Sequence, residues 1–102
     1  YGHGAAAVGK TALENGADRL GVLTAEEGAL LRGTFKKTPI HLLAPSLPEE
    51  APLIIRNGLV PTADSINFIR ALDRAAKRTA PYHLDIDLGL GRWGVKPEAA
   101  GA

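Results

Sequence analysis

Short apolar runs divide the chain at nearly regular intervals. They span residues 20–23, 40–44, 59–60 and 83–88, so a new run begins roughly every 20 residues. Each run is too short for an ordinary helix, and turn-forming residues lie beside it, which favours β-strands. We therefore expect one strand at each of the four runs.

The segments that flank the first apolar run carry helix signals. Residues 5–14 repeat small apolar side chains at spacings of three and four, and the Asn-Gly pair that follows is a typical helix stop. Thr24 and Glu27 form the pattern of a capping box, in which each side chain bonds the other residue's backbone amide. We expect helices over residues 5–14 and from Thr24 to about residue 33.

Two further helices are predicted in the second half of the chain. Ser46 and Glu49 repeat the capping-box spacing, and a second Asn-Gly pair marks the end of that helix. Asp64 or Ser65 would cap the fourth helix, which is the longest. Its expected apolar stripe consists of Ile66, Ile69, Leu72 and Ala76.

The regular alternation of helix and strand determines the expected fold class. Strands joined through helices form right-handed crossovers and a parallel sheet. The pattern is compatible with an open doubly wound sheet and with an incomplete barrel. A complete (β/α)8 barrel of the TIM type needs roughly 250 residues, so this chain of 102 residues would hold about half of one. We expect an α/β fold with parallel strands.

Composition and charge narrow the function classes. A hydrophobic fraction of 45% is enough for a core, while a net charge of +1 and 5% aromatic residues argue against nucleic-acid binding. The chain lacks cysteine, which excludes disulfides and thiolate chemistry. No apolar run approaches the roughly 18 residues of a membrane span, and no signal-peptide pattern is present. Methionine is absent even at position 1, so we expect a piece of a longer protein.

Residues 4–11 match the phosphate-binding P-loop pattern G-x-x-x-x-G-K-T. In that motif Lys10 would reach the outer phosphates of a nucleotide, and Thr11 would hold magnesium. The run of alanines within the match favours a helix over a wrapped loop, and only three residues precede it. A P-loop nucleotide-binding protein is therefore kept as an alternative function for this chain.

Residues 89–94 match the dinucleotide-binding pattern G-x-G-x-x-G directly after a predicted strand. That fingerprint also needs a helix and then an acidic residue about 20 positions later. Here Pro97 follows closely and only a few residues remain beyond it. We therefore interpret these residues only as a glycine-rich loop that presents Arg92 at the carboxyl end of a parallel strand. This is the place where α/β proteins bind ligands.

His83, Asp85 and Asp87 alternate along the last predicted strand and should share one face. Such a set could hold a divalent ion. Carboxylates inside a barrel need a cation or hydrogen-bond donors, and Arg92 is the expected partner, so we favour ion pairing over a metal site. At the other end of the chain, His3 lies between two glycines before a helix, a position suited to binding phosphate.

Several segments together resemble alanine racemases. Residues 1–4, Tyr-Gly-His-Gly, followed by an alanine-rich helix, resemble the segment just after the cofactor lysine of that family. Residues 16–20 and 24–28 are similar to the next strand and helix of the family. Residues 87–94, Asp-Leu-Gly-Leu-Gly-Arg-Trp-Gly, resemble its D-T-G-M-G-R-x-G loop. The likeness extends in one order and with family-like spacing to about Glu98.

The resemblance implies that residues 1–102 are a fragment of an N-terminal (β/α)8 barrel that binds pyridoxal 5'-phosphate, with a C-terminal β-domain outside the chain. Tyr1 would contact the cofactor phosphate. Arg92 would reach the phenolic oxygen of the cofactor and the carboxylate of the substrate. The cofactor lysine would precede residue 1, and the second base would be a tyrosine from the partner subunit of a homodimer. The chain alone should therefore be inactive.

The implied activity is the interconversion of L- and D-alanine, which supplies D-alanine for peptidoglycan in the cytoplasm. Asp85 stands where many members carry a carbamylated lysine, so we expect its carboxylate to orient Arg92 without carbon dioxide. Leu88 and Trp93 replace a threonine and a smaller aliphatic residue of the family pattern. These departures leave open a racemase for another amino acid, or a non-catalytic carrier of pyridoxal phosphate on the same barrel.

Overall fold

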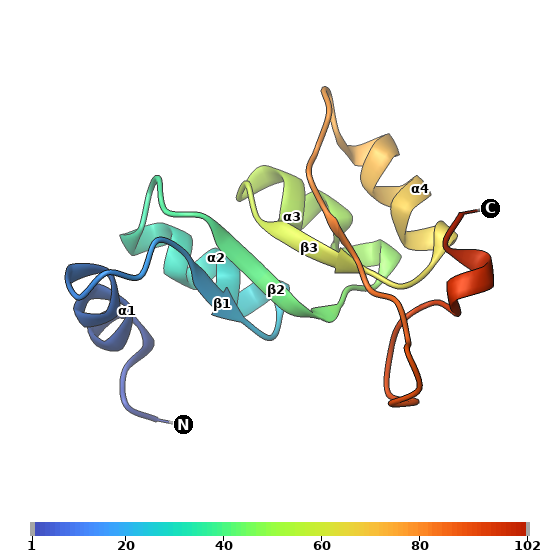
Figure 1. Ribbon diagram of the computed structural model, residues 1–102. Coiled ribbons are helices and arrows are strands. Elements are labelled where there is room, and N and C mark those ends of the chain that lie inside the picture. The colour runs from blue at the N-terminus through green and yellow to red at the C-terminus, as the bar shows by residue number, and fades with distance from the viewer. Residues whose placement is uncertain (1, 102) are drawn as a thin grey trace.

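Helices and strands alternate along residues 2–101, the part of the chain that the computed structural model describes. The helices are α1 (Ala5–Glu14), α2 (Ala25–Thr34), α3 (Ala51–Arg56) and α4 (Ile66–Ala75). The strands are β1 (Leu20–Val22), β2 (Ile40–Pro45), β3 (Val60–Ala63) and β4 (His83–Leu84). Single 3-10 turns precede α3 and follow β4, namely η1 (Pro48–Glu50) and η2 (Pro97–Ala99). The predicted order of helices and strands is confirmed (Figure 1).

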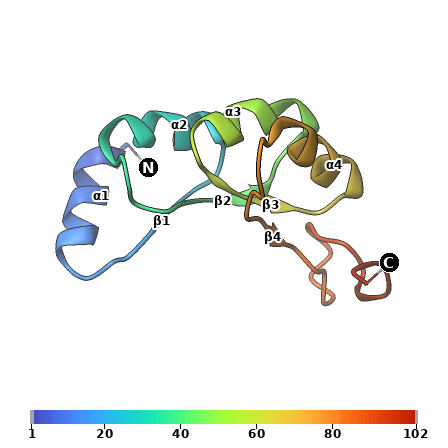
Figure 2. The same ribbon diagram turned by 90° about the horizontal axis from the view of Figure 1, so that it is seen from above.

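The sheet keeps the strands in sequence order, β1-β2-β3-β4, and each neighbouring pair is parallel. Seen from above, the helices lie together on one side of the strands (Figure 2). A doubly wound sheet reverses its strand order and carries helices on both faces. A barrel keeps the sequence order and places all its helices outside. The arrangement is therefore part of a (β/α)8 barrel, and the doubly wound alternative is wrong.

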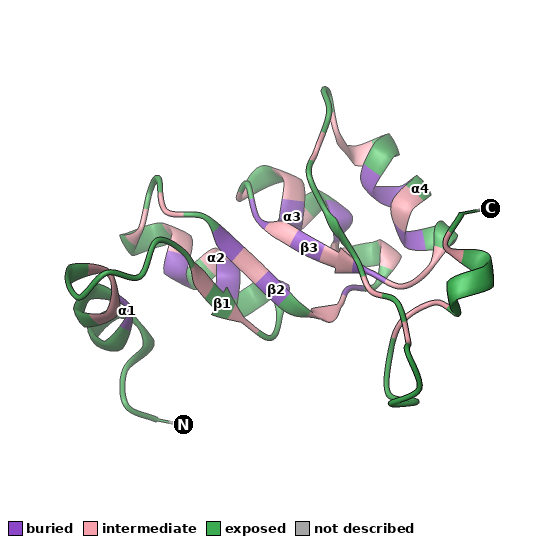
Figure 3. Ribbon diagram, viewed as in Figure 1, coloured by how far each residue is buried: buried purple, intermediate pink, exposed green. Residues whose placement is uncertain are grey.

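The two faces of the sheet differ in burial. The buried strand residues that share a core with the helices are Ile40, Leu42 and Ala63. The residues that alternate with them, among them His41, Leu43 and Thr62, belong to the face that carries no helices. Leu43 is 60% exposed there. Figure 3 shows the buried residues gathered in β2, β3 and the helices beside them. The uncovered face corresponds to the inside of the barrel.

Side-chain caps account for the starts of α2 and α4. The Thr24 hydroxyl accepts the amide of Glu27, and the Glu27 carboxylate accepts the amide of Thr24, so the predicted capping box is confirmed. Ser65 caps α4 by accepting the amide of Phe68. The cap predicted at Ser46 is wrong, because its amide still pairs with β3 through the Thr62 carbonyl.

The chain leaves the sheet one residue after Ser46, and the turn begins there. The Glu50 carboxylate accepts the amide of Leu47 at 2.6 Å, which closes the first turn of η1. The residues that form this contact, Leu47 and Glu50, thus lie one position after the predicted pair, Ser46 and Glu49. Pro48 lies in the first turn as predicted, since a helix start needs no amide donor there.

The apolar stripe predicted for α4 is partly wrong. The helix buries Phe68, Ala71 and Leu72, whereas Ile66 is 57% exposed. At 100° per residue, Ile66 lies about 160° around the helix from Phe68. The aromatic ring has the largest apolar area on this helix, so the face centred on it turns toward the core. Ile69 lies at the edge of that face and is half-buried.

The guanidinium of Arg32 joins three segments at the amino-terminal edge of the sheet. It donates to the carbonyls of Phe35 and Thr38 in the loop before β2, each at 2.8 Å. It also donates to Asn57 and Gly58 before β3, at 2.8 and 3.0 Å. Four backbone carbonyls are thereby satisfied by one side chain. Between residues 2 and 101, no helix has the length and apolar character needed to cross a membrane.

Candidate functional site

The parallel pairing between β3 and β4 covers only two residue pairs, so the chain after β4 is free to pair with itself. Thr62 pairs with His83 and Ala63 with Leu84, and β3 then ends. The chain beyond pairs with itself: the Asp87 amide donates to the Val95 carbonyl, and the Val95 amide donates to the Asp85 carbonyl, both at 2.9 Å. The strand predicted for residues 83–88 is therefore only His83–Leu84, and residues 85–95 form a closed loop.

Inside this loop the carboxylate of Asp87 binds backbone amides. One oxygen, Oδ1, accepts the amide of Gly89 at 2.9 Å and that of Gly91 at 3.0 Å. These donors stabilise the anion and hold the pKa of the Asp87 carboxyl below its ordinary value, the Gly91 amide having the larger effect. Sequence reasoning placed Asp87 on a strand face and missed this role. The signal was present in the pattern Asp-x-Gly-x-Gly, since aspartate commonly binds amides a few residues ahead.

Glycine at position 94 is required by packing as well as by conformation. Its φ is +98°, and a Cβ there would lie 2.7 Å from the Asp87 amide nitrogen and 3.0 Å from the Ile86 carbonyl carbon. Both contacts are with backbone, so any side chain would open the loop. No α-helix follows within the described residues, only the turn η2, so the dinucleotide-binding interpretation of residues 89–94 is wrong.

Arg92 is exposed on this loop, and its guanidinium carbon lies 4.4 Å from the centre of the Trp93 ring. Asp85, Asp87, Arg92 and Trp93 line one hollow of about 290 Å³. The predicted ion pair between Asp85 and Arg92 is not formed within residues 2–101, where the guanidinium stacks on the indole ring instead. The structure thus gathers the predicted charged residues around one hollow without joining them.

The ring of His83 lies against that of a second histidine, His41 of β2. The two ring centres are 4.8 Å apart, with the rings at an angle of 50°, on the inner face of the sheet. Burial lowers the pKa of His41 below its ordinary value, and the nearby His83 and Arg19 lower it further. Across residues 2–101 no three acidic or histidine side chains come close enough together to hold a metal ion. The strand-face set of His83, Asp85 and Asp87 does not form.

The P-loop alternative is wrong, because residues 5–14 are helical. Lys10 and Thr11 lie on successive positions of α1, and the ammonium of Lys10 is 3.9 Å from the carboxylate of Glu14. A helix directs its amides along its axis and cannot wrap a phosphate in the way that a P-loop does. Gly4, at φ +85°, ends the segment before the helix and provides no side-chain cap.

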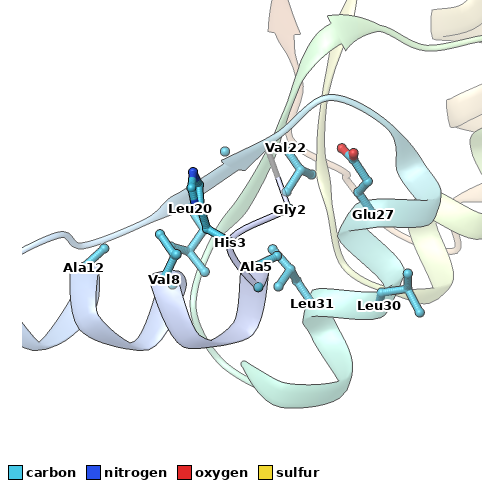
Figure 4. Close-up of a pocket in the computed structure, with 13 residues that line it drawn as sticks. Gly2, His3, Ala5, Val8, Ala12, Leu20, Val22, Glu27, Leu30 and Leu31 are labelled. Atoms are coloured by element: carbon cyan, nitrogen blue, oxygen red, sulfur yellow. The ribbon is translucent and has the colours of Figure 1, made fainter.

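A larger hollow of about 740 Å³ lies between α1, β1 and α2 (Figure 4). Its walls are mainly apolar side chains, among them Val8, Leu20 and Leu31. The Glu27 carboxylate at its rim already accepts two backbone amides. The remaining polar groups are His3 and the uncapped first turn of α1 at one end of the hollow, and the rest of its wall suits apolar packing. Tyr1, the residue expected to contact a cofactor phosphate, lies outside the described residues.

Parallel strands in sequence order, helices on one face and a charged loop after the last strand define a segment of a (β/α) barrel. Barrels of this class place ligands at the carboxyl ends of their strands. The family model described as "Alanine racemase, N-terminal domain" matches residues 1–102. The chain belongs to this family.

Individual relatives agree over nearly the whole chain. Alanine racemase 2 of Clostridium acetobutylicum is 39% identical over 98% of this chain and 26% of its own length. Alanine racemase of Halothermothrix orenii is 37% identical over 98% of this chain and 27% of its own. The chain therefore spans about a quarter of the curated relatives it matches.

Solved structures give the same result. Alanine racemase of Clostridium difficile 630 superposes with a TM-score of 0.87 and 32% identity, covering 95% of this chain and 26% of that one. A complex of that protein with cycloserine gives the same TM-score and covers 28% of its chain. At this identity the likeness supports both the fold and the relationship.

Proposed function

We propose that the protein containing this chain is a pyridoxal-phosphate-dependent alanine racemase that interconverts L- and D-alanine. The family match and the relatives named alanine racemase support this assignment. The observation that carries it is the glycine-rich loop after β4, which holds Arg92 exposed at the carboxyl ends of the strands. A guanidinium in this position suits the carboxylate of an amino acid, because its paired N–H groups match the two oxygens.

The residues of this chain fit the cofactor at two places. The guanidinium of Arg92 forms no ion pair or hydrogen bond within residues 2–101, so its donors are available to a phenolic oxygen. The first turn of α1 has no side-chain cap, and free helix amides suit a phosphate. Tyr1 would supply a further phosphate contact. When bound, pyridoxal phosphate supplies the electron withdrawal that stabilises the carbanion left by loss of the α-proton.

Arg92 would hold the substrate carboxylate and so fix the α-carbon for proton removal. Asp85 lines the same hollow, and we propose that its negative charge orients the guanidinium. A lysine upstream of Tyr1 and a tyrosine from the second domain of a partner subunit would act as the two bases. On this reading the chain is a fragment of the N-terminal barrel domain and is inactive alone. The full-length enzyme would be a cytoplasmic homodimer that provides D-alanine for peptidoglycan.

The test is exchange of the α-proton of L-alanine in heavy water, followed by NMR, with the full-length protein and pyridoxal phosphate. We expect exchange together with loss of optical activity. The matched variant Arg92→Lys keeps the charge but loses the paired donors, and it should raise the KM for alanine. Cofactor binding without exchange would contradict alanine as substrate and point to another amino acid or to a carrier. Absence of cofactor binding would overturn the assignment.

A further inference from the structure

The amides of Gly89 and Gly91 depend on Asp87 for their hydrogen bonds. Within residues 2–101 neither amide donates to a backbone carbonyl, and both donate to the same carboxylate oxygen. Both glycines have positive φ, at +116° and +70°, so no helix or strand holds this backbone in place. Glycine-rich backbone has many accessible conformations, and ordering it costs conformational entropy. The carboxylate of Asp87 therefore selects the shape of the loop.

Arg92 lies between two points at which the loop is held. On one side it follows Gly91 directly, whose amide is bonded to Asp87. On the other side Val95 pairs with the backbone of Asp87 and Asp85, and Gly94 packs against that same backbone. Asp87 thus takes part in both attachments, through its side chain on one side and its main chain on the other.

We propose that Asp87 is a positioning residue for Arg92: its side chain fixes the turn that aims the guanidinium at the carboxylate of the amino-acid substrate. This inference rests on the proposed function, since the substrate carboxylate comes from it. Asp87 itself touches no substrate. Its role also differs from the one proposed for Asp85, which acts on the guanidinium by charge, whereas Asp87 acts on the backbone before it.

The experiment compares Asp87→Ala and Asp87→Asn in the full-length protein. Asparagine keeps the size and one neutral acceptor oxygen, so it should hold the loop in part. Asp73→Asn is the matched control, because Asp73 is exposed on α4 and its side chain makes no hydrogen bond within the described residues. We expect Asp87→Ala to raise the KM for alanine by about tenfold or more, with a smaller change in kcat. The KM of Asp87→Asn should lie between those of the wild type and Asp87→Ala.

A second readout needs neither cofactor nor turnover. Hydrogen–deuterium exchange of the cofactor-free protein should accelerate in residues 85–95 of Asp87→Ala and stay unchanged in α2 and α3. Asp73→Asn should leave residues 85–95 at the wild-type rate. Unchanged exchange in this loop would overturn the inference, because Asp87 would then not hold its shape. If Asp87→Ala does not fold, the same comparison with Asp87→Asn decides.

Double variants test whether Asp87 acts through Arg92. In an Arg92→Ala background, adding Asp87→Ala should change the KM by less than about twofold, since the group to be positioned is already gone. If Asp87→Ala raises the KM as much in the Arg92→Ala background as it does in the wild-type protein, Asp87 acts independently of Arg92 and the inference is overturned. If the proposed function itself is wrong, the result is distinguishable, because the wild-type protein would then not exchange the α-proton of alanine.

Discussion

The segment from β1 to α4 and the loop after β4 are held together by different forces. Every buried apolar residue of the core lies between Ala25 and Leu72, and no residue from 73 to 101 is buried. Figure 3 shows the loop after β4 in the colours of exposed and intermediate residues. The loop instead keeps its shape through hydrogen bonds among its own backbone and the carboxylate of Asp87. Apolar packing therefore fixes where the carboxyl ends of the strands lie, and polar contacts shape the loop that carries Arg92 there.

The side chain of Arg32 makes four hydrogen bonds, more than any other described side chain of the packed segment, and its removal should have the largest effect. We expect Arg32→Met to lower the free energy of unfolding by about 3 kcal/mol, because four carbonyls lose a charged donor. Chemical unfolding of the full-length protein measures this. Arg56→Met is the control, since Arg56 is exposed at the end of α3 and should lose less than about 0.5 kcal/mol. Equal losses would show that the Arg32 contacts contribute no specific stability.

Alanine variants at two glycines of α2 distinguish the effect of core packing from that of helix propensity. A Cβ on Gly28 would lie 2.8 Å from Leu59 Cδ1 and 3.3 Å from Leu42 Cδ2, whereas a Cβ on Gly33 would meet nothing within 4 Å. We expect Gly28→Ala to destabilise by about 1–2 kcal/mol and Gly33→Ala to stabilise by about 1 kcal/mol. Unfolding of both variants under one set of conditions gives the difference. A stabilised Gly28→Ala protein would show that this part of the core is loosely packed.

In the loop, Asp85→Ala should weaken substrate binding and leave stability nearly unchanged. We expect the KM for alanine to rise roughly fivefold, because the guanidinium of Arg92 loses a nearby negative charge. Asp85→Glu restores the charge and should bring the KM back toward the wild-type value. Steady-state kinetics of the full-length enzyme measure both variants. An unchanged KM in Asp85→Ala would remove Asp85 from the proposed site.

The smallest expected effect is a pH dependence at the boundary between the two regions. The pKa of His41 is lowered in the folded protein, first by burial and then by His83 and Arg19, while Asp18 opposes the shift. Its contribution to stability is therefore complete above the ordinary pKa and is lost as the pH falls below it, because the unfolded chain binds the proton more readily. Histidine changes charge between about pH 5 and 8. Over that range, the unfolding temperature of His41→Leu should depend less on pH than that of the wild-type protein.

The sequence by itself determined the order of helices and strands and most of their ends. The capping box of Thr24 and Glu27 and the two Asn-Gly stops use contacts within a few residues, so the local sequence contains all the partners. The apolar runs placed the strands because a strand buried in a parallel sheet is itself a short continuous apolar run. The alternation also predicted the parallel sheet, which is confirmed. The loop motif around Arg92 indicated the region in which we propose the site.

Only the tertiary structure decided features that depend on distant partners. The side of α4 that is buried follows from the fit of Phe68 into the core, and the length of β4 follows from where β3 ends. The four bonds of Arg32 join residues up to 26 positions apart. Whether the sheet was doubly wound or part of a barrel depended on the face that the helices cover. Such contacts form only when separate segments pack together, so no local pattern of residues contains them.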